Sequence, residues 1–177
     1  MGGMPTPEFV LSLREKVGTD HLWLPGCKAV VLRGRSADGG GVDGGVGSGR
    51  EVLLVRRMDN GRWTLPAGII EPGEEPASTA VRETLEETNV TCAPRRLAGV
   101  GTTHPVTYPN GDRAQYLDVV MVMDYVSGEA RVNDDENTDV GWFCLDALPD
   151  LPELHARALQ WGLAETPEAR FVAPAEA

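Results

Sequence analysis

The chain has 177 residues, enough for one domain with a sizeable core, and its 41% hydrophobic and 24% charged content is ordinary for a globular protein. A formal net charge of −11 argues against a nucleic-acid polymer as partner, because basic surfaces bind phosphate backbones, but it permits one small phosphorylated ligand beside a bound metal. The apolar runs are shorter than the roughly 18 residues that span a membrane, and the three widely spaced cysteines predict buried reduced thiols in a cytoplasmic protein: Cys27, Cys92 and Cys144.

Residues 1–26 are expected to form an added N-terminal helix followed by a link. Thr6 can cap a helix over residues 6–17, and Pro7 suits its first turn. Apolar side chains recur along this helix at helical spacing: Phe9, Val10, Leu13 and Val17. The stripe predicts packing against the domain or against a second subunit, which would make a homodimer. Residues 22–25 are expected to be the link.

Two strands are expected on either side of a glycine-rich segment. Residues 27–33 and 51–58 each contain a buried apolar run. Between them, residues 37–49 hold seven glycines in 13 positions, too little apolar mass to order the segment, so we expect a flexible hairpin tip. It is not a phosphate-binding loop, because no Lys-Ser or Lys-Thr follows and the next element is a strand.

Two arginines close the second of these strands. Arg56 and Arg57 should point to opposite faces, because side chains alternate along a strand. At most one of them can face a phosphate, and we assign this substrate-binding role to Arg56. Trp63, after the turn at residues 59–61, is expected to be a packing residue, with a platform for the substrate as the alternative.

Residues 68–90 predict a glycine-bearing loop followed by a helix with one carboxylate-rich face. Pro76 lies where a first helical turn tolerates proline. At 100° per residue, three glutamates fall within an arc of about 100°, largely opposite a face that includes Leu85. These are Glu83, Glu86 and Glu87.

Three like charges so close together repel one another. Arg82 is the only nearby cation in the sequence, and it reaches Glu86 at i+4. A divalent cation such as Mg²⁺ resolves the repulsion because it takes carboxylate and phosphate oxygens as ligands. The alternative is a solvated acidic face, which is what most glutamate clusters are.

The same stretch resembles the Nudix box: Gly, five residues, Glu, seven residues, Arg-Glu, an aliphatic, any residue, Glu-Glu, any residue, Gly, an aliphatic. The matching residues keep every spacing: Gly68, Glu74, Arg82, Glu83, Glu86, Glu87 and Val90. Thr84 replaces an aliphatic residue, and Asn89 replaces the final glycine. Asparagine tolerates the left-handed backbone second only to glycine, so we expect Asn89 to end the helix in that conformation.

After the box, three strands, a helix and a polar tail are expected: residues 96–103, 113–125, 140–145, 151–163 and 165–177. Strands, the box helix, more strands and a final helix predict the α/β class, with a mixed sheet covered on both faces. This order agrees with the α/β/α sandwich that the Nudix resemblance implies, here over residues 27–164.

The resemblance implies hydrolysis of a diphosphate bond in a nucleoside diphosphate linked to another group, with Mg²⁺ as cofactor and Mn²⁺ as a substitute. By position, Glu83 and Glu86 would act in catalysis, and Arg82 would orient a box glutamate. Which glutamate accepts the proton stays open. The metal ligands that it implies are Glu83, Glu86, Glu87 and the carbonyl of Gly68.

Two residues outside the box are assigned to substrate binding. Tyr108 could stack on a nucleobase, with a packed loop aromatic as the alternative. Glu136 could add a loop carboxylate to the metal site or act as base, with a solvated acidic loop as the alternative.

The residues that follow the box do not decide between several classes of substrate. Pro105 lies 15 residues after Val90, like a proline of ADP-ribose hydrolases in this family, and Tyr108 lies 18 after, like a tyrosine of dinucleoside polyphosphate hydrolases. The sequence therefore allows ADP-ribose, another sugar nucleotide or a dinucleoside polyphosphate. A pyrophosphohydrolase that removes damaged nucleoside triphosphates is a second enzyme reading. A nucleotide-sensing domain without catalysis is the alternative of another class.

Overall fold

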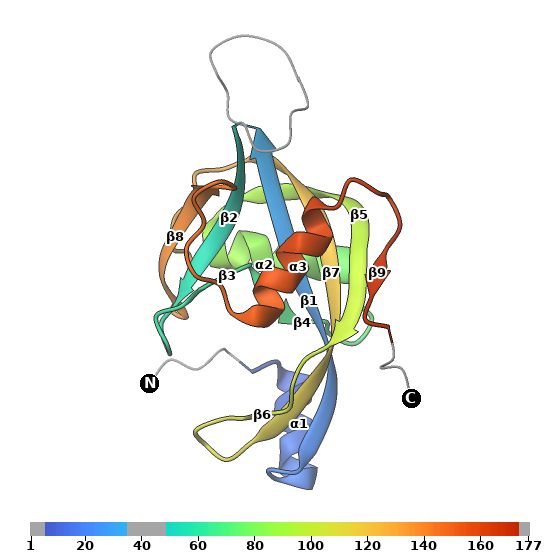
Figure 1. Ribbon diagram of the computed structural model, residues 1–177. Helices are drawn as coiled ribbons and strands as arrows, with labels where there is room; N and C mark the ends of the chain where they lie inside the picture. Colours follow the sequence, from blue (N-terminus) through green and yellow to red (C-terminus); the bar gives the residue numbers. More distant parts are fainter. Residues whose placement is uncertain (1–5, 35–48, 174–177) are drawn as a thin grey trace.

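The computed structural model describes residues 6–34 and 49–173. The glycine-rich hairpin tip expected at residues 37–49 therefore lies, except for its last residue, outside the described residues. Figure 1 shows the arrangement of the described elements around one central sheet.

The sheet is mixed and has the order β3-β2-β1-β7-β5-β9. Its centre is a parallel pair, β1 (His21–Gly34) and β7 (Arg113–Ser127), which runs in register from His21 opposite Arg113 to Leu32 opposite Asp124. On one side β1 pairs antiparallel with β2 (Arg50–Arg57), and on the other β7 pairs antiparallel with β5 (Thr91–Thr102). The smaller strands are β3 (Trp63–Thr64), β4 (Ala67–Ile69), β6 (Val106–Thr107), β8 (Asn137–Cys144) and β9 (Arg170–Phe171).

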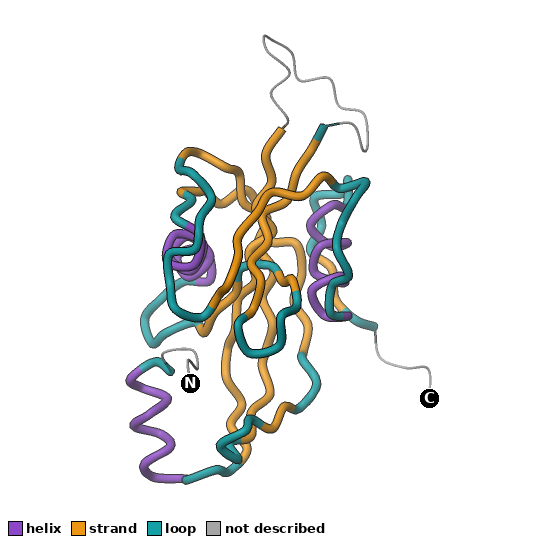
Figure 2. The backbone as a smooth tube through the Cα atoms, turned by 90° about the vertical axis from the view of Figure 1, so that its left-hand side faces the viewer, coloured by secondary structure: helices purple, strands orange, loops and turns teal. Residues whose placement is uncertain are grey.

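Two helices cover opposite faces of this sheet, as the side view in Figure 2 shows. Helix α2 (Pro76–Thr88) packs with the odd-numbered apolar residues of β1, such as Ala29 and Val31. Helix α3 (Glu153–Leu163) packs with the even-numbered ones, such as Val30 and Leu32. The α/β class and the helix–sheet–helix layering predicted from the sequence are thus confirmed, because side chains alternate across a strand that is buried on both faces.

Helix α1 (Glu8–Val17) lies beside the end of the β1–β7 pair at which both strands begin (Figure 1). Its N-cap is Pro7, which offers no side-chain cap, so the cap expected at Thr6 is wrong by one residue. Only part of the expected apolar stripe is covered: Val10 is buried against Leu24, whereas Leu13 and Val17 are exposed. The homodimer stays a prediction.

Several boundaries differ from the sequence-based expectation for one reason, which is strand pairing over long sequence distances. The link expected at residues 22–25 belongs to β1, because β7 extends alongside it. Strand β5 begins at Thr91 rather than at residue 96, and β8 begins at Asn137 rather than at residue 140. The tail contributes β9, which pairs with β5.

Asn89 ends α2 with φ 58° and ψ 19°, and its backbone N–H donates to the carbonyl of Leu85. The left-handed conformation expected from the box is confirmed. We expect Asn89→Gly to change the free energy of unfolding little, because glycine relieves the backbone but removes two side-chain hydrogen bonds. Asn89 Nδ2 donates to Glu129 O at 3.1 Å, and Asn89 Oδ1 accepts from Arg131 Nη2 at 3.3 Å. Asn89→Val should destabilise by about 1 kcal/mol or more, because a β-branched residue is strained there. Urea unfolding of both variants measures this, and equal midpoints for Gly and Val would contradict it.

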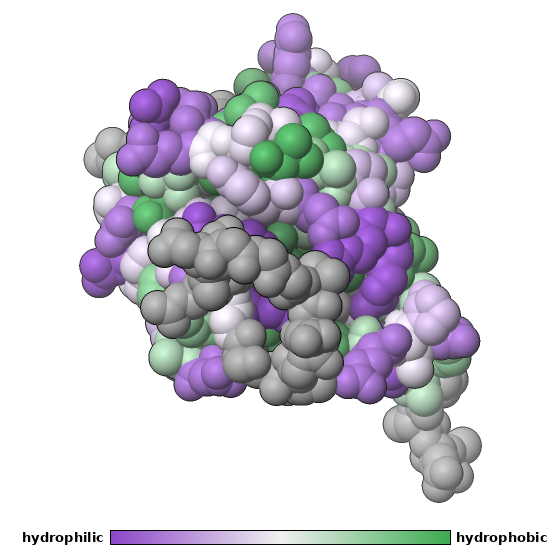
Figure 3. Space-filling model, turned by 90° about the horizontal axis from the view of Figure 1, so that it is seen from above, coloured by the Kyte–Doolittle hydropathy of each residue, from purple (hydrophilic) through white to green (hydrophobic). Residues whose placement is uncertain are grey.

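The surface at the end of the sheet where β1 ends and β2 begins mixes hydrophilic residues with smaller hydrophobic groups (Figure 3). In the part of the chain that the structure describes, every helix is too short or too polar to cross a membrane.

Candidate active site

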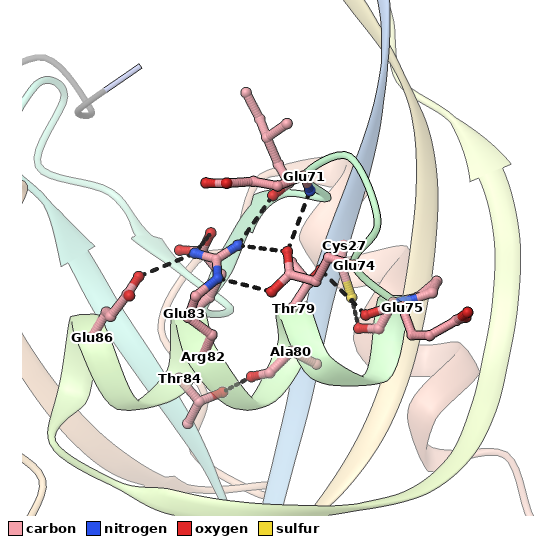
Figure 4. A network of polar contacts seen from close by, with 12 residues as sticks. Cys27, Glu71, Glu74, Glu75, Thr79, Ala80, Arg82, Glu83, Thr84 and Glu86 are labelled. Carbon is pink, nitrogen blue, oxygen red and sulfur yellow. Dashed lines mark hydrogen bonds and ion pairs between the residues drawn. The ribbon is translucent and has the colours of Figure 1, made fainter. Parts of the chain in front are cut away.

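The guanidinium of Arg82 joins the loop after β4 to helix α2 (Figure 4). Its Nε and Nη2 donate to the Glu74 carboxylate, each at 2.9 Å, and Nη2 also reaches the carbonyl of Ile69. Its Nη1 donates to Glu83 at 2.8 Å and to Glu86 at 3.1 Å. The hydrogen bond from Arg82 lowers the pKa of Glu74 to about 2. Arg82 therefore reaches Glu86 as expected, and it also fixes the loop and Glu83.

Only glycine fits at position 68 while the Glu83 carboxylate stays where it is. A Cβ atom at residue 68 would lie 1.8 Å from Glu83 Oε1, far inside contact distance. Residue 68 is in strand β4, opposite Cys27 of β1, so the strand holds it in place. The first glycine of the box is therefore explained by close approach of a carboxylate rather than by backbone freedom.

The three box glutamates do not share one exposed face, which corrects the helical-wheel expectation. Glu87 is 4% exposed, and its Oε2 has no hydrogen-bond partner in the described residues. Leu85, expected on the buried side, is 45% exposed. The sheet and the loop before β8 lie on the Glu87 side of α2, so the buried face is rotated toward the carboxylates.

Burial makes two of these carboxyl groups hard to ionise. Loss of hydration raises the pKa of Glu87 well above its ordinary value, and the nearby Glu83 adds to the effect. Loss of hydration also raises the pKa of Glu83 to about 7, although Arg82 opposes the shift. Both groups would be stabilised as carboxylates by a cation.

The loop before β8 brings two further carboxylates to Glu87. One oxygen each from Glu87, Asp134 and Glu136 lies within 4.8 Å of the others. An all-oxygen set with an unpartnered buried atom fits a hard divalent cation. From the sequence, Glu136 is expected near the metal site, whereas no such role is predicted for Asp134. The run of residues 134–136 was the available signal, but sequence gives no distance between that loop and α2.

The ligand set implied by the resemblance is therefore only partly assembled. Glu83 and Glu86 are held by Arg82, while Glu87 is grouped with Asp134 and Glu136. All five carboxylates nevertheless line one groove, with Arg82 on its wall. Gly68 lies nearby and lines the adjoining cleft instead.

Arg57, not Arg56, faces this site. Arg57 Nη1 donates to Glu136 at 3.3 Å, and Arg57 lines the cleft. Arg56 is exposed, and its Nε donates to the carbonyl of Gly61. Alternation along β2 predicted that only one of the two would face the site, but the choice of face depends on the pairing with β8, which shifts register between Arg56 and Arg57.

Beside the groove lies a cleft of about 540 Å³, and Glu87 and Ile69 line both. Tyr108 lies in the cleft lining, where its hydroxyl is 2.7 Å from that of Tyr116. The expectation that Tyr108 is near the site agrees with this position. Tyr116 was missed, because nothing in the sequence pairs it with a tyrosine across the β6–β7 turn.

His155, at the start of α3, closes another part of the cleft in its neutral form. The backbone N–H of Leu65 donates to His155 Nδ1 at 3.2 Å, which requires that nitrogen to be unprotonated. Burial lowers the pKa of His155 to about 3, and the positive charge of Lys28 makes the next largest contribution.

This depressed pKa predicts acid sensitivity. The folded protein keeps His155 neutral, whereas the unfolded chain takes up a proton near pH 6.5, so stability is complete above pH 6.5 and falls as the pH drops toward 3. Between pH 6.5 and 5, the neutral His155 should lower the free energy of unfolding by roughly 1–2 kcal/mol. We expect His155→Gln to lose less stability over this range than the wild type, in urea unfolding at each pH. The exposed His104 provides the matched variant His104→Gln, and an equal pH slope in all three proteins would contradict the assignment.

The fold and the site together define a class of protein: an α/β/α sandwich in which a glycine-bearing loop and the following helix place carboxylates in a groove beside a cleft. A family model described as the NUDIX domain matches residues 44–162. The chain belongs to the Nudix family, and its box is the segment from Gly68 to Val90.

Curated relatives share the same part of the chain. The chain is 37% identical over 106 residues to the NAD-capped RNA hydrolase NudC of Erwinia tasmaniensis. The matched region covers 59% of this chain and 38% of that protein. It is 39% identical over 106 residues to the NudC of Pseudomonas aeruginosa, covering 59% and 35%. The chain thus spans well under half the length of these relatives.

Solved structures show the same fold. An ADP-ribose pyrophosphatase from Streptococcus suis superposes with a TM-score of 0.59 at 23% identity, over 84% of this chain and 98% of that one. A MutT NUDIX hydrolase from Burkholderia pseudomallei gives a TM-score of 0.58 at 26% identity, over 79% and 98%.

Proposed function

We propose that this protein hydrolyses a diphosphate bond in a nucleoside diphosphate-linked small molecule, with Mg²⁺ as cofactor and Mn²⁺ as a substitute. The observation that carries the proposal is the position of Glu87. It is buried, its Oε2 has no hydrogen-bond partner among the described residues, and one of its carboxylate oxygens lies near Asp134 and Glu136. It also lines both the carboxylate groove and the cleft. A diphosphate at this junction would have room for its two substituents on either side.

Within this proposal Glu87, Asp134 and Glu136 hold the cation, with Glu83 beside them. When bound, the cation supplies charge neutralisation for the diphosphate and lowers the pKa of water. Arg57, which contacts Glu136, lines the cleft as a positive charge suited to a phosphate oxygen. It takes over the substrate-binding role first assigned to Arg56.

The proton of the attacking water goes to a carboxylate of the groove. Arg82 holds Glu83 and Glu86 in fixed positions, so either can serve as the acceptor once water lies beside it. As water attacks phosphorus, the phosphorus–oxygen bond of the anhydride breaks, and the products are two phosphorylated fragments.

The nucleoside part is assigned to the cleft, where Tyr108 presents an aromatic ring hydrogen-bonded to Tyr116. The names of the NudC relatives favour a diphosphate that joins two nucleosides, as in NAD, over a nucleoside triphosphate. ADP-ribose or another sugar nucleotide, and a dinucleoside polyphosphate, have the same linkage chemistry. The net charge of −11 favours the small molecule over a long RNA.

A substrate panel tests the function. The protein is incubated with Mg²⁺ or Mn²⁺ and with NAD, ADP-ribose, a UDP-sugar, diadenosine tetraphosphate, dGTP, or an RNA carrying NAD at its 5′ end, and the products are identified. We expect two monophosphates from NAD, ADP-ribose or the UDP-sugar, and AMP plus ATP, or two ADP, from diadenosine tetraphosphate. Preferred cleavage of dGTP would favour the damaged-nucleotide reading. Metal-dependent binding without product from any substrate would favour the sensor.

A further inference from the structure

A buried ion pair forms part of the cleft, and the proposed chemistry does not use it. Lys28 on β1 and Asp118 on β7 are 7% and 2% exposed, and Lys28 Nζ donates to Asp118 Oδ1 at 2.6 Å. Both line the cleft, together with His155 of α3. The pair lies in the central parallel strands, so the sheet fixes its position.

Lys28 satisfies only one of the two carboxylate oxygens. Asp118 Oδ2 is buried and has no hydrogen-bond partner among the described residues. Buried polar atoms are nearly always paired, and Asp118 is among the residues that line the cleft, so its unpaired oxygen calls for a partner from outside the chain. The positive charge of Lys28 balances the carboxylate, which leaves an acceptor with little net charge around it.

A substrate bound at the carboxylate groove would place one of its substituents near Asp118. Glu87 lines both the carboxylate groove and the cleft, so a diphosphate held at Glu87 directs one of its substituents into the cleft. The wall of that cleft includes Asp118 and the hydrogen-bonded pair Tyr108 and Tyr116. A substituent lying there meets an aromatic surface and one buried acceptor.

We propose that Asp118 Oδ2 accepts a hydrogen bond from an N–H or O–H group on the uncharged end of the substrate and thereby sets substrate specificity. The inference rests on the proposed function for the orientation of the ligand. A neutral donor suits the site better than a cation, because Lys28 already cancels the charge of the carboxylate. Two parts of a nucleotide carry such a donor, the amino group of the base and the hydroxyl groups of the ribose. Because Oδ2 exposes almost no surface, the donor has to be a small group, and the side chains around Asp118 have to shift to let it reach the oxygen.

Asp118→Asn is the sharpest test. The change keeps the shape of the side chain, and the amide oxygen can still accept from Lys28. The amide NH₂ then replaces Oδ2, so an acceptor becomes a donor at one position. The loss should weaken binding of a nucleotide that carries the matching donor by about 10- to 100-fold.

Binding of monophosphates separates this inference from the hydrolytic function, since they contain no diphosphate bond. Dissociation constants are measured by calorimetry with Mg²⁺ for AMP, IMP, 2′-deoxy-AMP and 3′-deoxy-AMP. If the base amino group is the donor, wild type prefers AMP to IMP about tenfold or more, and Asp118→Asn loses or reverses this preference. If a ribose hydroxyl is the donor, the preference is for AMP over one of the deoxynucleotides.

Glu51→Gln is the matched control. Glu51 also forms an ion pair, with Arg33 at 2.8 Å, but it does not line the cleft, so its change should leave all four constants as in wild type. Melting temperatures show whether each variant is folded. If Asp118→Asn does not fold, the inference is tested by the dissociation constants of the four nucleotides with the wild type.

Three results overturn the inference. One is a folded Asp118→Asn protein that binds AMP within twofold of wild type. The second is a wild type that does not distinguish AMP from IMP or from either deoxynucleotide. The third is a wild type that binds none of them. Discrimination that persists in a protein without hydrolase activity would reject the proposed function and leave this inference standing.

Discussion

Glu87→Gln is expected to lower turnover of the preferred substrate by roughly 10²-fold or more while raising the melting temperature of the metal-free protein. Turnover falls because the variant loses the carboxylate that joins Asp134 and Glu136 at the end of the cleft. Stability rises because glutamine removes a group whose ionisation is opposed by burial and by neighbouring carboxylates. A residue that served only the fold would give the reverse combination.

The measurement combines turnover across a Mg²⁺ titration with melting temperatures in the presence and absence of the metal. Wild type should gain stability from Mg²⁺, because a ligand that binds only the folded state raises its stability, and the variant should gain less. Glu75→Gln is the matched control, since Glu75 is exposed just before α2 and the change in chemistry is the same. Undiminished hydrolysis in Glu87→Gln would remove Glu87 from the mechanism.

Gly68→Ala is expected to lower turnover while leaving the stability of the fold nearly unchanged. The new methyl group would lie 1.8 Å from Glu83 Oε1, so the carboxylate has to move away from its place beside Arg82. The end of a glutamate side chain can move at low cost, and the backbone of residue 68 does not have a positive φ, so the fold should tolerate alanine. Turnover should fall by roughly 10- to 100-fold, because the moved carboxylate no longer has its catalytic position.

Gly34→Ala supplies the control, since a Cβ there meets no atom of residues 6–34 and 49–173 within 4 Å. Both alanine variants should melt within a few degrees of wild type, and only Gly68→Ala should lose turnover. A Gly68→Ala protein with wild-type turnover would show that the position of Glu83 does not matter for the reaction. A large fall in its melting temperature would show that the glycine serves the fold.

The local part of the site was predictable because it depends on short spacings. The box from Gly68 to Val90, the helix start at Pro76, the left-handed end at Asn89 and the contact of Arg82 with Glu86 follow from helix geometry and backbone preferences. The two-sided burial of the central strand was also visible as an unbroken apolar run, and it gave the layered α/β class.

Residues that meet across long sequence distances required the tertiary structure. The sequence located Glu87 on a carboxylate face, but only the packing of α2 against the sheet and the loop before β8 buried it beside Asp134. Alternation along β2 limited the choice to one arginine, and the pairing with β8 selected Arg57. Asp118 had no sequence signal at all, because its partner Lys28 is 90 residues away and the parallel pairing of β1 with β7 brings them together. Short spacings fix how a segment folds, whereas the neighbours of its side chains are fixed by strand register and helix packing.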